Sequence, residues 1–481
     1  MLTSATRKAE LGQYFTSAPI ASFMASLFAA IQDSEVSLLD AGAGNGMLTA
    51  AFVDRWLTDS SDGCHAHVTA YELDEEMVGY LEDALNSYAT RAYEEGHTLT
   101  SNVYRDDFIE AASRILLDDH FEGFTHAILN PPYKKLGNHS YHKQLLQDVG
   151  IESVNLYSAF VALAILLLRP HGELVAIIPR SFCNGPYYLP FRKLILNQAS
   201  IRNVHLFEAR DKAFGGDGVL QENIVIRLVK TVVSNPVCVS HSTDATFTDY
   251  ASRNVPRTEI VRPDDPDLII HIPKGPSSER KSVLANARCS LDELDIQVST
   301  GPIVDFRLKE HLRDNLIAES VPLLYPGHFV NQRSRYPISG SNKPNAIMVT
   351  PDTEKWLYPS GHYVLVRRFS SKEERKRVIA NVLLPTEIAT DRVGFENHLN
   401  VFHVHRKGLQ ADLAFGLAGY LNSTFVDEYF REFSGHTQVN ASDLRFLPYP
   451  SLQILIQLGQ EFLSLPALDQ SIIDSIVAVY L

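Results

Sequence analysis

The sequence predicts an α/β protein in which a doubly wound, mostly parallel sheet is followed by a separate C-terminal α+β domain. Two observations lead to this prediction. Between Ser37 and about Lys230, short apolar runs typical of strands alternate with amphipathic segments of helical period. After Lys230 the alternation stops, and residues 231–280 are rich in Ser, Thr, Asp and Pro, which indicates a linker or an irregular segment. We therefore expect one domain over residues 1–240 and a second over residues 241–481.

The elements of the first domain follow one another in βαβ order, and the first strand ends in a Gly-rich turn that opens a helix. The expected strands are Ser37–Asp40, His67–Glu72, Ser101–Tyr104, Ala127–Leu129, Glu173–Ile178, Ile201–Phe207 and Asn223–Val229. The expected helices are Met47–Leu57, Asp74–Tyr88 and Leu156–Leu168. In a sheet wound in this way, ligands bind at the carboxyl ends of the strands. From about residue 285 onward, short strands and turns mix with helices.

The composition is that of a globular protein without a membrane anchor. The chain has 481 residues, which is enough for two or three domains. Its longest apolar run, Phe160–Leu168, is far shorter than a membrane span, and Met1–Lys8 has no signal-peptide core. The four cysteines are scattered and form no CxxC pair, which argues against a disulfide framework or a zinc site. We expect a cytoplasmic protein with reduced thiols and no bound metal.

The net charge of −14 argues at first against a polyanionic partner, but the charge is unevenly distributed. Residues 331–410 carry about +6. The cations of this stretch include Arg333, Arg335, Lys343, Arg367, Arg368, Lys372, Arg375, Lys376, Arg377, Arg406 and Lys407. A local basic face of this kind can bind nucleic acid on an acidic protein. The alternative is a solvated helix around residues 373–377.

Glycines and carboxylates stand at the ends of the first three strands. Asp40 precedes a turn that contains Gly42 and Gly44, where the backbone can approach a ligand closely. Glu72 ends the second strand, where a carboxylate can accept both hydroxyls of a ribose. At the end of the third strand, Asp107 can accept an adenine amino group and Phe108 can pack on the purine. Asp107 is also suited to cap the helix that follows it.

The turn lacks the sequence features of pyrophosphate sites. It contains no GxGxxG and is not followed by GK[ST], so the backbone donors that hold a pyrophosphate are not in place. An adenosine attached to a positively charged sulfonium needs no such donors, and acidic residues suit it. The ordered set of strand-end residues therefore indicates S-adenosylmethionine as the cofactor.

The tetrapeptide Asn130-Pro131-Pro132-Tyr133 follows the fourth strand. Two successive prolines fix their own φ angles and hold Asn130 extended, so the loop is stiff. The amide oxygen and a backbone carbonyl can accept both hydrogens of a planar amino group while the ring stacks on its face. The loop is suited to an amine attached to a π-system.

These motifs together resemble the Eco57I/TaqI-type adenine-specific DNA methyltransferases, the γ class of amino-methylating enzymes. Gln13-Tyr14-Phe15-Thr16 is similar to the family's first motif, although Ser17-Ala18-Pro19 replaces the usual Thr-Pro. Leu39–Gly46 resembles its Gly-rich motif, and residues 130–133 match its catalytic motif in full. A fainter likeness extends to residues 434–444, which resemble a segment of target-recognition domains.

The resemblance implies a Rossmann-like methyltransferase domain and a DNA target-recognition domain. It implies transfer of a methyl group from S-adenosylmethionine to N6 of an adenine flipped out of double-stranded DNA. The implied catalytic residues are Asn130, Pro131, Pro132 and Tyr133, with Phe214 as a second aromatic face. The implied cofactor-binding residues are Tyr14, Thr16, Asp40, Gly42, Gly44, Glu72, Asp107, Phe108 and Asn130. As a type II modification enzyme, the protein is expected to act as a monomer and to share its target site with a cognate endonuclease without forming a stable complex.

Other amine substrates remain open on the residues alone. Cytosine N4, RNA bases and the side-chain amide of a protein glutamine all present a planar amine to an Asn-Pro-Pro-Tyr loop. The glutamine methyltransferases lack a Gln-Tyr-Phe-Thr motif before the Gly-rich turn and have no long domain after the catalytic one. Carbon-5 methylation of cytosine needs a cysteine nucleophile, and none lies near the motif. Adenine in duplex DNA is therefore the expected substrate.

Overall fold

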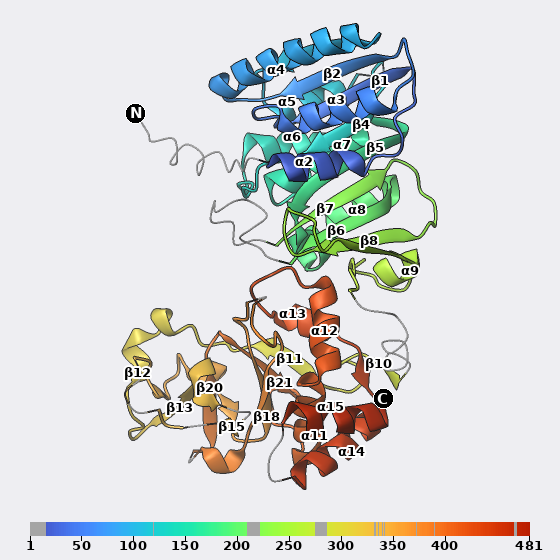
Figure 1. Cartoon of the computed structure of the whole chain (residues 1–481). Coiled ribbons are helices and arrows are strands. Elements are labelled where there is room, and N and C mark those ends of the chain that lie inside the picture. The colour runs from blue at the N-terminus through green and yellow to red at the C-terminus, as the bar shows by residue number, and fades with distance from the viewer. Residues whose placement is uncertain are drawn as a thin grey trace. The chain divides into compact units, whose positions relative to one another are not determined.

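The computed structural model describes residues 16–481, apart from positions 119, 209–221, 275–285, 331–332, 335, 339, 341, 372, 389 and 466–468. The chain divides into two compact units, Met1–Pro273 and Lys274–Leu481. Figure 1 follows both units from the N-terminus in blue to the C-terminus in red. The sequence prediction of a doubly wound α/β domain followed by an α+β domain is confirmed.

The first unit is built on a nine-stranded sheet of order β3-β2-β1-β4-β5-β7-β6-β8-β9. The pairs from β3 to β5 are parallel, whereas β7 is antiparallel to both of its neighbours. The strands are β1 (Glu35–Ala41), β2 (His65–Tyr71), β3 (Thr98–Tyr104), β4 (Phe124–Leu129), β5 (Leu168–Pro179), β6 (Ser200–Phe207), β7 (Asn223–Val229), β8 (Val237–Ser242) and β9 (Ala251–Val255).

Helices cover both faces of this sheet (Figure 1). Leu39 and Ala41 of β1 belong to one buried apolar cluster, and Val36 and Leu38 belong to another. Successive side chains of a strand point to opposite faces, so the two clusters are the two faces of the sheet. The first face is covered by α5 (Phe108–Ile115), α6 (Tyr141–Asp148), α7 (Leu156–Leu167) and α8 (Leu189–Gln198). The second is covered by α2 (Ala18–Ser26), α3 (Met47–Asp59) and α4 (Glu75–Glu94).

The strand order reverses between β1 and β4. From β1 the chain continues outward to β2 and β3 on one side, and it returns to β4 and β5 on the other. At such a reversal the loops that follow the two central strands diverge and leave a crevice at the carboxyl end of the sheet. The Gly-rich turn after β1 and the Asn130 loop after β4 both stand at this edge.

Residues 231–273 of the segment expected as a linker are instead part of the first unit. β8 pairs in parallel with β6, and β9 pairs with β8, so the unit continues to Pro273 rather than ending near residue 240. The serines that suggested a linker have a buried role. The hydroxyls of Ser240 and Ser242 lie 3.0 and 3.1 Å from the two ring nitrogens of the buried His205. Polar residues stand in this strand because they satisfy a buried imidazole.

The second unit contains two larger sheets, of orders β11-β21-β18-β19 and β12-β16-β13-β20-β17, and two short two-stranded sheets, β10-β22 and β14-β15. Its strands are β10 (Ala287–Cys289), β11 (Gln297–Thr300), β12 (Leu312–Arg313), β13 (Ser320–Leu324), β14 (Phe329–Val330), β15 (Arg333–Ser334), β16 (Ala346–Met348), β17 (Tyr358–Pro359), β18 (Tyr363–Arg367), β19 (Ala380–Leu383), β20 (Arg392–Phe395), β21 (Leu399–His403) and β22 (Tyr449–Pro450). Its helices are α11 (Ala411–Leu421), α12 (Thr424–Phe433), α13 (Ala441–Arg445), α14 (Leu452–Leu463) and α15 (Gln470–Tyr480). A short helix, α9 (Arg257–Ile260), belongs to the first unit.

Helices α11 and α14 approach each other closely through glycines. A Cβ on Gly416 would lie 1.8 Å from the carbonyl oxygen of Leu455, and a Cβ on Gly459 would lie 1.7 Å from that of Asp412. Only glycine permits backbones to pack at this distance. Across the parts of the chain described above, no helix has both the length and the apolar character needed to cross a bilayer.

Candidate active site

The Gly-rich turn after β1 is a tight left-handed bend. Gly42, Gly44 and Gly46 have φ angles of 78°, 56° and 81°, a region that other residues enter at a cost. The N–H groups of Gly42 and Ala43 both donate to the carbonyl of Tyr71, at 2.9 and 3.0 Å. The turn therefore requires glycine for its conformation and is tied to the end of β2.

Glu72 supports this turn directly. Its Oε2 accepts the N–H of Gly44 at 2.8 Å, and its Oε1 accepts the N–H of Asp74 at 2.8 Å. The carboxylate is only 4% exposed. The residue expected at a ribose thus also holds the Gly-rich turn and the start of α4 together, so its loss would disturb the turn itself.

Asp40 is a buried carboxylate with one unsatisfied oxygen. Its Oδ2 accepts the hydroxyl of Thr49 at 2.6 Å, whereas its Oδ1 has no hydrogen-bond partner in the described part of the chain. Burial raises the pKa of Asp40 to about 7, and the nearby charge of Glu72 acts in the same direction. A buried orphan acceptor beside a Gly-rich turn suits a ligand that carries a positive charge.

The third strand end shows the helix cap that the sequence allowed for Asp107. Asp107 caps α5, because its Oδ1 accepts the N–H groups of Ile109 and Glu110 at 2.9 and 3.2 Å. Its Oδ2 lies 3.1 Å from Nε2 of His142, so the cap is present and the second oxygen has a partner. His142 is a contact that sequence reasoning missed, since nothing distinguishes it from any other helical histidine.

Phe108 lies inside the core rather than on an open surface. It is 3% exposed, and its ring centroid lies 5.4 Å from that of Tyr71 and 5.0 Å from that of Phe160. Phe160 also stands 3.8 Å from where a Cβ on Gly42 would be, so this aromatic wall reaches the Gly-rich turn. The acidic turn, the strand-end carboxylates and this wall together fit an adenosine-bearing cation.

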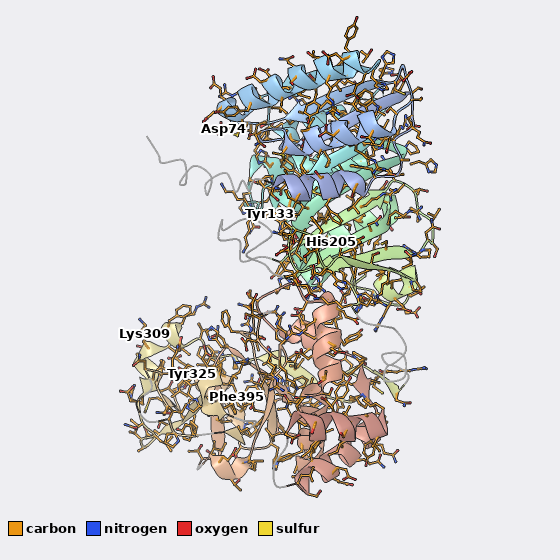
Figure 2. The ribbon with its side chains drawn as sticks, in the orientation of Figure 1. Asp74, Tyr133, His205, Lys309, Tyr325 and Phe395 are labelled. Carbon is orange, nitrogen blue, oxygen red and sulfur yellow. The ribbon has the colours of Figure 1, made fainter. Side chains whose placement is uncertain are left out.

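The Asn130 loop is held in a defined orientation. The amide Nδ2 of Asn130 donates to Oγ1 of Thr16 at 2.9 Å, which joins residues 114 positions apart. The hydroxyl of Tyr133, marked in Figure 2, contacts Oδ1 of Asn130 at 3.1 Å and the carbonyl of Ile177 at 3.2 Å. The structure thus brings Thr16, Asn130 and Tyr133 together. Tyr14 and Phe214 lie outside the described residues.

Residues 154–156 form a supporting segment that pairs with the end of this loop. The N–H of Leu136 donates to the carbonyl of Val154 at 3.0 Å, and the N–H of Leu156 donates to that of Lys134 at 2.8 Å. Between them, Asn155 pairs with Lys135 and caps α7 through its side chain. The capping role of Asn155 could have been inferred from its place directly before a predicted helix, whereas its pairing with Lys135 depends on two loops meeting in the fold.

The ring of Tyr133 rests edge-on against Tyr157, with centroids 6.2 Å apart. Tyr157 is buried, and its hydroxyl lies 3.1 Å from Oγ of Ser181. Tyr188 stacks on Tyr157 and accepts a hydrogen bond from Nδ2 of Asn155 at 2.8 Å. Tyr157 packs against the Tyr133 ring and contacts Ser181 and Tyr188. Both of these residues belong to the segment that follows β5, so this segment supports the ring.

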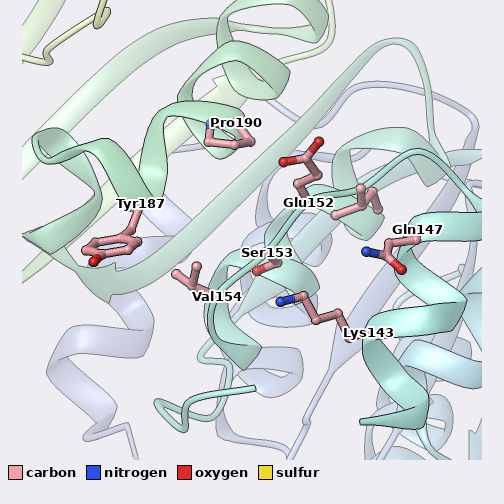
Figure 3. Close-up of a pocket in the computed structure, with 8 residues that line it drawn as sticks. Lys143, Gln147, Glu152, Ser153, Val154, Tyr187 and Pro190 are labelled. Atoms are coloured by element: carbon pink, nitrogen blue, oxygen red, sulfur yellow. The ribbon is translucent and has the colours of Figure 1, made fainter. Parts of the chain in front are cut away.

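A hollow of about 220 Å³ borders the supporting segment (Figure 3). Lys143 of α6 and the exposed Tyr187 are among the residues that line it, together with Glu152 and Ser153. The Gly-rich turn, Glu72 and Asn130 do not line it. This hollow is therefore separate from the crevice in which the strand ends converge.

The basic stretch of residues 331–410 is largely used inside the second unit. Arg377 is 1% exposed, donates to the carbonyl of His436 at 2.5 Å and lies 5.3 Å from the Phe430 ring centroid. Lys376 donates to the carbonyl of Asn422, and Arg367 forms an ion pair with Glu374. Counting charges overstated the basic face, because Arg377 and Lys376 satisfy backbone carbonyls and Arg367 is paired with a carboxylate. Arg335 and Lys372 lie outside the described residues.

The helix considered around residues 373–377 is also absent. The described residues of this segment form turns and bends, and the N–H of Arg377 donates to Oδ1 of Asp427 at 2.5 Å. Charged residues at helical spacing suggested a solvated helix, but the buried tie to α12 holds the segment as an irregular connection. Arg375 and Lys407 remain exposed.

Comparisons with known proteins identify the family to which the chain belongs. The Eco57I restriction-modification methylase family model matches residues 50–214. The chain is 49% identical to a type II methyltransferase of Bacillus subtilis, M.BsuBI, across 94% of this chain and 90% of that protein. It is 43% identical to the type II methyltransferase M.PstI of Providencia stuartii, across 98% of this chain and 93% of that protein.

Among solved structures, a nuclease-deletion mutant of the type ISP restriction-modification enzyme LlaGI aligns with 93% of this chain and 46% of its own, at 12% identity and a TM-score of 0.49. The family assignment rests on the sequence relatives. With these identities over nearly its full length, the chain belongs to the type II methyltransferases of the Eco57I restriction-modification methylase family, and S-adenosylmethionine is its methyl donor.

Proposed function

We propose that the protein methylates the N6 amino group of adenine at specific sites in double-stranded DNA, and that the adenine is flipped out of the duplex to be reached. The observation that carries this proposal is the hydrogen-bonded pair of Asn130 and Tyr133 beside the Gly-rich turn. An amide acceptor and an aromatic ring on one stiff loop match the edge and the face of a purine amine.

In this proposal the chain's own groups act on the amino nitrogen. Oδ1 of Asn130 and the carbonyl of Pro131 accept its two hydrogens, which draws the nitrogen lone pair out of conjugation with the ring. Pro132 keeps the loop stiff, and the ring of Tyr133 stacks on the flipped base. Phe214 is proposed as the second stacking face. When bound, S-adenosylmethionine supplies an electrophilic methyl group, so neither a covalent enzyme intermediate nor a strong base is required.

The proposed cofactor contacts follow the strand ends. Asp40 would face the positively charged end of the cofactor with its unsatisfied oxygen, and Glu72 would accept from the ribose hydroxyls. Gly42 and Gly44 would let the backbone approach it. The adenine would lie near Asp107 and Phe108, while Tyr14 and Thr16 would close over the methionine end.

The remaining assignments concern DNA. We propose that the second unit recognises the target sequence and that the first unit is catalytic. As in the type II systems that the relatives' names indicate, methylation would protect the host's DNA from an endonuclease of the same specificity. The enzyme is proposed to act as a monomer, because duplex DNA can be recognised and modified by one chain without a stable complex with the nuclease.

Nucleoside analysis tests this proposal. Duplex DNA of mixed sequence would be incubated with the protein and methyl-labelled S-adenosylmethionine, digested, and separated by mass spectrometry. We expect N6-methyldeoxyadenosine, and Asn130→Ala should form it about a thousandfold more slowly or not at all. Label in N4-methylcytosine or only in protein would contradict the adenine assignment, and so would normal cofactor binding with no product on any DNA.

A further inference from the structure

Phe369 is an exposed aromatic side chain in the second unit. It follows β18, and 53% of its surface is accessible, whereas β18 itself is almost entirely buried. An exposed phenylalanine is not unusual by itself. Its surroundings distinguish this one, because the neighbouring side chains are imidazole and amide groups held in fixed positions.

Backbone hydrogen bonds fix the chain on both sides of this ring. The N–H of Val439 donates to the carbonyl of Arg368 at 2.7 Å, and the N–H of Ser370 donates to the carbonyl of Thr437 at 3.2 Å. The N–H of Arg368 donates to the carbonyl of His398 at 2.8 Å. Three segments that are distant in sequence, around residues 369, 398 and 438, therefore meet at Phe369.

Side chains reinforce this frame. The guanidinium of Arg368 donates to the carbonyl of Asn397 at 2.8 Å and to Oε1 of Gln438 at 3.1 Å. The fully buried Asn400 donates to the carbonyl of Val439 at 2.8 Å. Arg368 thus holds the side chain of Gln438 in place. Because Oε1 of Gln438 accepts from Arg368, the NH₂ group of Gln438 is the part of the amide left to donate to a ligand.

His398 lies beside Phe369, with ring centroids 5.2 Å apart. Its Nδ1 stands 2.5 Å from Oε1 of Glu396, and its side chain is 40% exposed, whereas Glu396 is fully buried. A carboxylate only accepts hydrogen bonds, so Nδ1 carries the hydrogen and Nε2 is the second polar atom of the ring. Glu396, which orients the ring, is buried and would not repel an approaching polyanion at close range, whereas the imidazole of His398 is accessible to it.

We propose that Phe369, His398 and Gln438 contact the bases of the target duplex, and that Phe369 inserts between two neighbouring base pairs and stacks on a base there, while the two polar groups read base edges. This inference rests on the proposed function, since it names the residues that select the site. A stacking face flanked by amide and imidazole groups matches nucleobases, which offer a π-face and hydrogen-bonding edges. A protein partner would favour a continuous apolar patch, and Phe369 is rimmed by polar groups instead.

The test compares Phe369→Ala with Leu452→Ala, a control that removes another exposed apolar side chain of the same unit, 42% accessible on α14. Sequencing of DNA methylated by the wild type first defines the site. Fluorescence anisotropy then gives the Kd for a duplex containing the site and for a scrambled duplex at the same salt concentration. We expect Phe369→Ala to weaken binding to the site about tenfold or more, with the scrambled duplex changed less than about twofold. Leu452→Ala should leave both values unchanged.

Two further readouts separate base contact from folding. The Tm and the Kd for S-adenosylmethionine of Phe369→Ala should equal those of the wild type, and Phe369→Trp should retain site binding because it keeps an aromatic face. Gln438→Ala and His398→Ala should broaden the set of methylated sequences. Unchanged site binding by Phe369→Ala would overturn this inference while leaving adenine methylation intact. If the wild type itself methylated no DNA, the proposed function would fail first.

Discussion

The hydroxyl of Tyr133 lies 3.1 Å from Oδ1 of Asn130, while the amide Nδ2 of Asn130 donates to Thr16. Together these contacts determine which way the amide faces, because the hydroxyl donates to the oxygen and the threonine accepts from the nitrogen. The proposed catalytic oxygen is thus oriented by the same side chain that is proposed to stack on the base. The same oxygen is the one proposed to accept an amino hydrogen of the base.

Separating the two roles of Tyr133 is the first prediction. Tyr133→Phe keeps the ring but removes the hydrogen bond, and we expect kcat to fall about tenfold, as for loss of one neutral hydrogen bond. Tyr133→Ala also removes the stacking face, so it should cost at least another tenfold and should weaken flipping of a fluorescent base analogue. Equal rates for Tyr133→Phe and the wild type would show that the hydroxyl does not orient Asn130 during the reaction.

Asn130→Ala should impair methyl transfer, whereas Asp107→Ala should impair cofactor binding. Removing the amide acceptor should lower kcat by about a thousandfold or more while the Kd for S-adenosylmethionine stays within a few-fold. Removing Asp107 should raise that Kd first, because this carboxylate caps α5 and stands at the proposed adenine. Isothermal titration and single-turnover kinetics measure the two effects. Normal turnover by Asn130→Ala would disprove the proposed mechanism.

Ionisation of Asp40 should make the cofactor-free protein less stable as the pH rises. Its pKa in the folded state is about 7, compared with 3.8 in its ordinary state, so the folded protein retains a proton between these values that the unfolded chain releases. The contribution of Asp40 to the free energy of unfolding should therefore be fully present below pH 4, fall as the pH approaches 7 and then level off, with a total change of at most about 4 kcal/mol. Asp40→Asn should flatten this part of the profile in urea denaturation. An unchanged slope would show that Asp40 ionises normally.

The same carboxylate should couple cofactor affinity to pH. A cationic ligand beside Asp40 favours its ionised form, so the affinity for S-adenosylmethionine should increase as the pH rises from 6 to 8. The ligand's own amino group also titrates, but it does so equally in the titrations of the wild type and of Asp40→Asn. The difference between the two pH profiles is therefore the contribution of Asp40. Identical pH profiles for the two proteins would place the cofactor's charge elsewhere.

Gly46 is predicted to be intolerant of a side chain for two separable reasons. Its φ is 81°, and a Cβ would lie 2.7 Å from Cδ1 of the buried Leu81. Gly63 has a φ of 83° with nothing within 4 Å of a Cβ, so Gly63→Ala measures the backbone cost alone, about 1 kcal/mol. Gly46→Ala should cost at least about 1 kcal/mol more and should also weaken cofactor binding. Adding Leu81→Ala tests whether the excess comes from that contact.

The helix pair of the second unit gives the largest expected stability effect. Gly416→Ala would place a methyl group 1.8 Å from the carbonyl of Leu455, and backbone cannot yield as a side-chain end can. We expect a loss of more than about 3 kcal/mol in urea unfolding of the second unit. Gly79→Ala, in α4 with open space around it, should instead stabilise the first unit by up to about 1 kcal/mol. A mild effect of Gly416→Ala would mean that the two helices separate readily.

The local chemistry of the chain was sufficient to predict strands β1 to β7 of the sheet and the edge at which the candidate site residues stand. Apolar runs of strand length mark β1 to β7, and glycines at positive φ and prolines act within a few residues of where they stand. Because parallel strands point their carboxyl ends to one edge, Asp40, Glu72, Asp107 and Asn130 could be assigned to one site before any distance was known.

Only the tertiary structure decided which groups satisfy one another. Thr16 reaches Asn130 across 114 positions, His142 faces Asp107, and Ser240 and Ser242 serve His205, which turned an expected linker into a strand. Arg377, counted as surface charge, is buried against α12. The physical reason is common to all of these contacts. A buried polar group requires a hydrogen-bond partner, and the packing of the folded chain, not spacing along the sequence, determines which residue provides it.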